Sequence, residues 1–136
     1  MPDQKPFVWP VRVYYEDTDA GGVVYYANYL RFMERARTEW LRSLGAEPDA
    51  LTADPGVLFV VAEVSIRYRQ PGRFNEALNV TVEDVRAGRS VLTLNQRIFR
   101  ETTGDLLTEA TVRAACVDAE TLKPQRIPEQ ILGALS

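Results

Sequence analysis

The sequence has no histidine among its 136 residues and only one cysteine. The lack of histidine excludes Ser-His-Asp and Cys-His catalysis and the usual zinc sites. One cysteine cannot form a disulfide within the chain. A magnesium or calcium site built from carboxylates alone remains open, but the chain contains neither the calcium-loop pattern nor a phosphate-binding P-loop. We therefore expect no metal and no cofactor, and carboxylates are the remaining candidates for catalysis.

Long apolar runs and an excess of positive charge are also missing. No apolar stretch approaches the roughly 20 residues that span a bilayer, and the N-terminal segment MPDQKPFVWP lacks the basic and apolar blocks of a signal peptide. A formal net charge of -3 argues against a nucleic-acid binder that neutralises many phosphates. We expect a cytoplasmic protein with no nucleic-acid partner and no integral membrane segment.

The composition and the order of the apolar patterns favour one α+β domain over residues 1–136. Hydrophobic residues make up 46% of the chain, which is enough for one core. Residues 48–56 have the composition of a loop. Apolar alternation predicts strands at residues 57–70, 78–85, 90–100 and 106–118. In the first of these, the residues expected to share one face are Leu58, Val60, Ala62, Val64, Ile66 and Tyr68.

The stretch from residue 14 to residue 45 combines a strand end, an acidic turn and a long helix. Alternation over residues 11–16 predicts a strand that runs into the turn at residues 17–22, where paired glycines permit tight backbone geometry. Helical spacing then predicts one helix over residues 27–44. Its apolar stripe comprises Tyr29, Leu30, Met33, Ala36, Trp40, Leu41 and Leu44. A single helix cannot cover both faces of an antiparallel sheet, so we expect a homo-oligomer.

The turn holds two candidate carboxylates, Asp17 and Asp19, shortly before the helix. Backbone N–H groups at a helix start are unpaired and carry the positive end of the helix dipole. If Asp19 lies beside a substrate carbonyl held by such donors, one turn offers a nucleophile or general base together with an oxyanion site. The alternative is that both acids only cap the turn and the helix, as aspartates often do.

The segment VRVYYEDTDAGGVVYYANYLRFMERARTEWLR, residues 11–42, resembles the signature of the 4-hydroxybenzoyl-CoA thioesterase family. Within that family it is most similar to the Tol-Pal-associated acyl-CoA thioesterase branch. The similarity continues through Phe59, residues 95–98 and residues 116–118, so it covers nearly the whole chain. The resemblance implies a hotdog fold, in which an antiparallel sheet wraps a long helix and active sites form where two subunits meet. It also implies a catalytic role for Asp19 and a tetramer made of two dimers.

Tyr26 is the one clear departure from that branch, whose members typically carry a histidine at the matching place. The hydroxybenzoyl-CoA branch has a tyrosine there. A neutral phenol cannot replace imidazole as a base near neutral pH. We therefore expect Tyr26 to contribute its backbone N–H to the catalytic site, while its ring shapes the acyl pocket. Gly22 and Val23, in the same turn as Asp19, are expected to bind the substrate.

Two arginines, Arg86 and Arg89, flank the predicted turn Ala87-Gly88 in a chain that is otherwise acidic. Guanidinium groups pair bidentately with phosphate oxygens, and the resemblance implies that basic residues in this region bind the phosphates of coenzyme A. We expect Arg86 and Arg89 to bind those phosphates. Solvated surface arginines are the alternative.

Three other side chains carry structural expectations. Arg37 falls within the apolar stripe of the helix and is expected to pair with a carboxylate, from Glu34 or Glu63. Phe32 projects away from that stripe, so it is expected to be either a lone exposed aromatic or part of a second face that a partner subunit covers. Cys116 is expected to be a small core residue, because no histidine is present to activate it.

The turn and the resemblance together predict hydrolysis of an acyl-CoA thioester to the free acid and coenzyme A. Asp19 would act on the thioester directly or through water. A catalytically silent hotdog module that binds acyl groups or serves as a scaffold is the alternative. Hotdog dehydratases match less well, because they use a histidine that this chain lacks.

Overall fold

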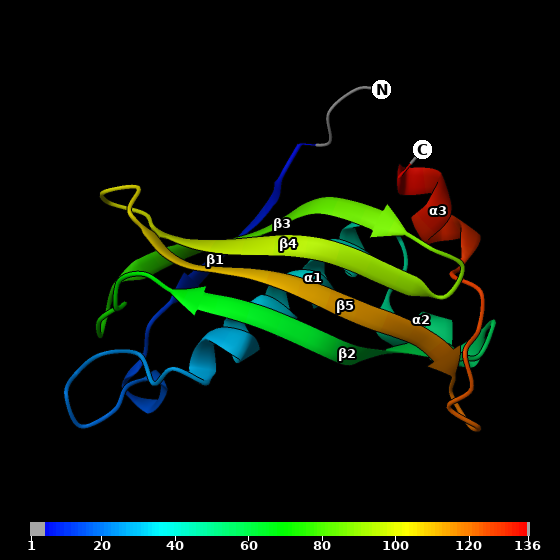
Figure 1. Ribbon diagram of the computed structural model, residues 1–136, viewed down its shortest axis with the longest axis horizontal. Helices are drawn as coiled ribbons and strands as arrows, with labels where there is room; N and C mark the ends of the chain where they lie inside the picture. Colours follow the sequence, from blue (N-terminus) through cyan, green and yellow to red (C-terminus); the bar gives the residue numbers. More distant parts are fainter. Residues whose placement is uncertain (1–4, 136) are drawn as a thin grey trace.

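The computed structural model describes residues 5–135, in which one antiparallel sheet curves around a long helix (Figure 1). The strands lie in the order β1-β3-β4-β5-β2. Their bounds are β1 Phe7–Arg12, β2 Val57–Tyr68, β3 Ala77–Ala87, β4 Val91–Arg100 and β5 Leu106–Asp118. The helices are α1 Asn28–Ser43, α2 Pro48–Ala53 and α3 Glu129–Leu135, and a 3-10 turn, η1, covers Tyr15–Asp17. The predicted α+β class is confirmed.

Helix α1 buries the stripe that its spacing predicts, but the buried face is wider. Met33 and Ala36 are fully buried, and Phe32 is as well. Phe32 thus belongs to this chain's own core, and both predicted alternatives, a lone exposed aromatic and a face covered by a partner, are wrong. The curved sheet encloses more of the helix circumference than a flat layer would, so a residue beside the main stripe is also covered. The helix ends before Gly45, whose φ of +75° is readily adopted only by glycine.

Strand β2 contains a bulge that changes which residues face the helix. The register shifts between Val61 and Glu63: Val61 pairs with Ala114 of β5, and Val64 pairs with Val112. Residues two apart in β5 share a face, so Val61 and Val64 also share one. Inward-facing residues therefore have odd numbers before the bulge, as at Val61, and even numbers after it, as at Val64. The predicted face of even-numbered residues is wrong for the part of β2 before the bulge.

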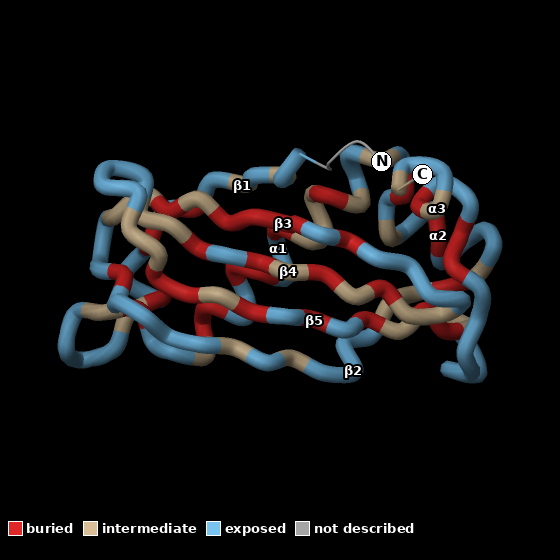
Figure 2. Tube along the Cα trace, turned by 45° about the horizontal axis from the view of Figure 1, so that its top comes forward, coloured by how far each residue is buried: buried red, intermediate tan, exposed pale blue. Residues whose placement is uncertain are grey.

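Strand β2 is also an open edge of the sheet. Within residues 5–135 it pairs with β5 alone, and Figure 2 shows it mostly exposed, in contrast to β3. Val60 and Val61 are 41% and 47% exposed. A long edge strand with unpaired backbone groups and exposed valines is a natural association surface.

Two boundaries differ from the predictions. The first strand is β1, and the chain then enters η1, so the strand predicted over residues 11–16 begins and ends too late. Pro10 is tolerated in β1 because that strand lies at the sheet edge. Residues 48–53 form α2 instead of a loop: Pro48 suits the first helical position, and Leu51 is 2% exposed.

No helix among the described residues has the length and apolarity to cross a membrane.

Arg37 has a neutral hydrogen-bond partner in place of the predicted carboxylate. It donates to Gln96 Oε1 at 2.9 Å, and the part of the chain that the structure describes places no carboxylate within ion-pair distance of it. Burial lowers the pKa of Arg37, and the charge of Glu34 acts in the opposite direction. Gln96 is fully buried and also donates to the Met33 carbonyl of α1 at 3.0 Å. The predicted ion pair is wrong, because a buried amide from β4 satisfies the guanidinium.

Cys116 is fully buried in β5, as predicted for a small core residue. Its thiol contacts the Arg126 carbonyl oxygen at 3.7 Å. Burial raises the pKa of the Cys116 thiol, which disfavours the nucleophilic thiolate.

Candidate active site

The acidic turn forms a small hairpin between residues 18 and 24. Thr18 and Val24 form an antiparallel bridge. Inside it, the Asp19 N–H donates to the Val23 carbonyl at 2.9 Å, and the Gly22 N–H donates to the Asp19 carbonyl at 3.0 Å. Gly22 has a φ of +79°, which favours glycine. Gly22 and Val23 therefore lie beside Asp19 and hold its backbone, and the Gly22 N–H is already paired within the hairpin.

The Asp19 side chain is exposed at the tip of this hairpin. Its Oδ1 accepts the Gly21 N–H at 2.9 Å, the geometry of an Asx turn. A Cβ at Gly21 would lie 3.3 Å from that oxygen, so the glycine leaves room for the carboxylate. Within residues 5–135, Oδ2 has no hydrogen-bond partner. One oxygen is thus held in place while the other faces solvent, an arrangement suited to attack or proton transfer.

Asp17 has the opposite environment. It is 5% exposed, its Oδ2 accepts the Tyr14 N–H at 2.8 Å, and its Oδ1 accepts the Asn28 side-chain N–H at 2.8 Å. The carboxylate therefore joins the segment after β1 to the first residue of α1. Both acids thus have a capping contact, as the alternative expectation holds: Asp17 uses both of its oxygens, whereas Asp19 uses only Oδ1.

Tyr26 lies in an aromatic cluster just before α1. The residue is 61% exposed, and its ring centroid lies 5.0 Å from that of Tyr25 and 6.1 Å from that of Tyr68. The Tyr68 hydroxyl donates to the Tyr26 carbonyl at 3.2 Å. Burial raises the pKa of Tyr68, and Tyr26 adds to this shift. Among the described residues no acceptor pairs with the Tyr26 N–H, as expected for a donor close to a helix start.

Arg86 and Arg89 lie at the other end of the sheet from Asp19. Arg12, next to the acidic turn, pairs with Ala77 at the beginning of β3, whereas Arg86 stands near the end of that strand. The 11 residues of β3 span roughly 35 Å, and Figure 1 shows the two turns at opposite ends. Both arginines are exposed. Within one chain, the structure does not bring them together with Asp19.

An apolar cavity of about 240 Å³ lies between α1, α2 and β2. Leu41, Leu51 and Phe59 form part of its wall, with Arg37 and Glu34 at polar positions. The cavity borders the C-terminal half of α1, so it is remote from the Asp19 hairpin of the same chain. Sequence spacing does not reveal this cavity, because the bulge in β2 changes which residues point inward.

The comparisons identify the family. A model of the thioesterase-like superfamily matches residues 13–135. The chain belongs to this superfamily. It is 43% identical over 128 residues to the acyl-CoA thioesterase YbgC of Haemophilus influenzae, covering 94% of this chain and 93% of that protein. It is 45% identical over 127 residues to the acyl-CoA thioester hydrolase YbgC of Escherichia coli O157:H7, covering 93% of both. The predicted resemblance to this branch of thioester hydrolases is confirmed.

A solved structure supports the architecture of this superfamily member. Slr0204, a 1,4-dihydroxy-2-naphthoyl-CoA thioesterase from Synechocystis, superposes with a TM-score of 0.87 at 22% identity, covering 96% of each chain. At this identity the likeness establishes the fold alone. The predicted hotdog fold, one helix wrapped by an antiparallel sheet, is confirmed.

Proposed function

We propose that this chain is a cytoplasmic acyl-CoA thioesterase with Asp19 as its catalytic carboxylate. The observation that carries the proposal is the contrast between the two acids of the turn: Asp17 is buried and bonded, whereas Asp19 is exposed on a hairpin that fixes its backbone. Relatives at 43% and 45% identity that are named for acyl-CoA thioester hydrolysis supply the substrate class.

In this reaction, water adds to the carbonyl carbon and the carbon–sulfur bond breaks, which gives a carboxylic acid and the thiol of coenzyme A. The Asp19 carboxylate either attacks the carbonyl carbon, forming an anhydride that water then hydrolyses, or removes a proton from the attacking water. The Gly22 N–H is paired within the hairpin. We therefore assign polarisation of the thioester carbonyl to the Tyr26 backbone N–H.

The experiment that tests this function measures thiol release from purified protein across aliphatic and aromatic acyl-CoA esters of several lengths. We expect at least one ester to be hydrolysed with saturation kinetics. If every ester remains intact while acyl-CoA still binds, the chain is a silent acyl-binding module and the proposed activity is wrong.

We further propose that two copies associate along β2, whose outer edge is open. In an antiparallel pairing about a two-fold axis, the Tyr68 end of one β2 lies beside the Val57 end of the other. The Asp19 hairpin of one copy then lies near the apolar cavity of its partner, and the partner's Arg86 and Arg89 lie at that same end. This pairing unites carboxylate, acyl pocket and phosphate-binding arginines, and two such dimers form the expected homotetramer.

Sedimentation or light scattering at micromolar protein should show a dimer or a tetramer. Replacing Val60 with Asp should shift the protein toward monomer, because Val60 is 41% exposed on the open edge, does not line the apolar cavity, and a charge there would be buried on association. Replacing exposed Arg113, a residue of the inner strand β5, with Asp is the control. A parent protein that is an active monomer would contradict the shared site.

Replacing Arg86 and Arg89 together with Ala should raise KM for acyl-CoA while kcat stays nearly unchanged. The arginines would hold the phosphates equally in the ground state and the transition state, so their loss weakens uniform binding. Steady-state kinetics with full-length coenzyme A esters and with acyl-pantetheine, which lacks the nucleotide phosphates, provide the measurement. An unchanged KM for coenzyme A esters would place the phosphate site elsewhere.

Tyr26→Phe should keep most of the activity, because the proposed contribution of Tyr26 is its backbone N–H and the shape of its ring. The hydroxyl makes no hydrogen bond within the described residues. The measurement is kcat and KM on the best ester from the panel. A loss of kcat by more than about tenfold would assign the phenol a direct chemical role.

A further inference from the structure

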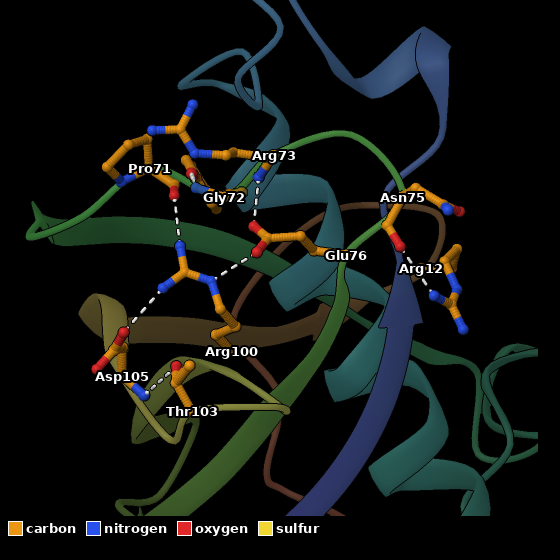
Figure 3. A network of polar contacts seen from close by, with 10 residues as sticks. Arg12, Pro71, Gly72, Arg73, Asn75, Glu76, Arg100, Thr103 and Asp105 are labelled. Atoms are coloured by element: carbon orange, nitrogen blue, oxygen red, sulfur yellow. Dashed lines mark hydrogen bonds and ion pairs between the residues drawn. The ribbon is translucent and has the colours of Figure 1, made fainter.

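Arg100, the last residue of β4, holds three separate parts of the chain together. Its Nε donates to Glu76 Oε2 at 2.7 Å, its Nη1 to Asp105 Oδ2 at 2.9 Å, and its Nη2 to the Pro71 carbonyl at 2.9 Å (Figure 3). The side chain is only 13% exposed. Each nitrogen of the guanidinium is thus used, and the planar group is fixed in one orientation.

Two of these partners bound the segment Pro71–Glu76, which connects β2 to β3 and contains no helix or strand. Glu76 adds an internal bond, because its Oε1 accepts the Arg73 N–H at 2.7 Å. Asn75 has a φ of +69°, a conformation that most residues avoid. The path of this segment therefore depends on the contacts that hold it: Arg100 and Glu76 form an ion pair, and Arg12 Nη1 donates to the Asn75 carbonyl at 2.8 Å.

The same segment supports the Asp19 hairpin. The Val24 N–H donates to the Gly72 carbonyl at 2.8 Å, the Phe74 N–H donates to the Gly22 carbonyl at 3.3 Å, and Val23 forms a bridge with Arg73. These contacts hold the strand that leads from Asp19 toward α1. Gly72 also donates its N–H to the buried Tyr29 hydroxyl at 2.9 Å, which ties the segment to the helix.

We propose that Arg100 is a positioning residue for Asp19, acting through the segment Pro71–Glu76. This inference rests on the proposed thioesterase function and adds a residue that does not touch the substrate. Arg100 fixes the segment at Pro71 and Glu76, the segment fixes the hairpin at Gly22 and Val24, and the hairpin sets where the Asp19 carboxylate stands.

The first test compares Arg100→Gln with Arg97→Gln. Both arginines belong to β4 and both make ion pairs, but Arg97 bonds to Glu83 at 2.6 Å, away from the hairpin. Arg100→Gln should lower kcat by about 10- to 100-fold per folded molecule with KM within about twofold, because a displaced carboxylate loses the reactive geometry. Arg97→Gln should leave kcat and KM unchanged even if it lowers stability.

Two further variants keep the test decisive if Arg100→Gln does not fold. Arg100→Lys retains the charge but cannot reach three separate acceptors with one ammonium group, so its kcat should fall between those of the parent and Arg100→Gln. Gly72→Ala leaves the arginine intact, but its Cβ would stand 3.2 Å from Val24 Cγ2 and 3.5 Å from the Tyr29 hydroxyl. It should displace the hairpin from the other side and lower kcat selectively.

Amide hydrogen exchange gives a readout that does not require activity. The Val24 and Phe74 amides should exchange faster in Arg100→Gln, Arg100→Lys and Gly72→Ala, and at the parent rate in Arg97→Gln. If the parent hydrolyses no thioester, the proposed function fails, while faster exchange at these two amides still supports the hold of Arg100 on the hairpin. Parent-like kcat together with parent-like exchange in the Arg100 variants overturns the inference, as does an equal loss of kcat in Arg97→Gln.

Discussion

Asp19→Asn is expected to lower kcat by about 10²–10⁴-fold, the range associated with a lost catalytic base. The amide can neither attack the thioester as a carboxylate does nor accept a proton from water. Its side-chain oxygen can still accept the Gly21 N–H that now binds Oδ1 at 2.9 Å, so the hairpin should keep its shape. The free energy of unfolding should change by no more than about 0.5 kcal/mol, as for most exposed positions.

The measurement combines steady-state thiol release with urea denaturation followed by circular dichroism. Folding must be shown to be unchanged, because the loss in kcat is meaningful only for folded protein. Gly22→Ala is a useful comparison, since it strains the same hairpin at a φ of +79° without removing the carboxylate. If Asp19→Asn hydrolyses acyl-CoA as fast as the parent, the mechanism proposed for this chain is wrong.

Asp17→Ala should have the largest effect on stability, lowering the free energy of unfolding by about 2–3 kcal/mol. The substitution removes a 5% exposed carboxylate that accepts two hydrogen bonds, from Tyr14 N–H and the Asn28 side chain. The Asn28 amide is buried and would lose its acceptor without gaining free access to water. The start of α1 would then be held less firmly to the segment after β1.

The matched control for Asp17→Ala is Asp19→Ala, two residues along the chain. The exposed Asp19 carboxylate accepts one hydrogen bond, from the Gly21 N–H, so its loss should cost about 0.5 kcal/mol or less. Urea denaturation of both variants under the same conditions measures the difference. Equal stabilities would mean that the Asp17 bonds do not contribute to the fold as the structure indicates.

The amino-acid sequence alone determined the main elements and the location of the acidic turn. The helical stripe that includes Met33, Ala36 and Trp40 predicted α1 to within a residue at each end. Strong alternation predicted β5 at the bounds observed, and β2, β3 and β4 to within two residues at each end. The absence of histidine directed attention to carboxylates, and the motif around Asp19 indicated the family. These features are local, because each depends on spacing or residue type within one short stretch.

Tertiary structure decided what each of these residues does. Asp17 and Asp19 are the same residue type two positions apart, and tertiary packing, including contacts with Tyr14 and Asn28, buries the first and leaves the second exposed. Gln96, 59 residues from Arg37, replaced the carboxylate that helical spacing favoured. Arg100 reaches Pro71 across the sheet, a contact that no local pattern predicts. Such contacts join segments far apart in the chain, so they are set by the register of the strands and the curvature of the sheet, and neither is encoded by spacing within a single stretch.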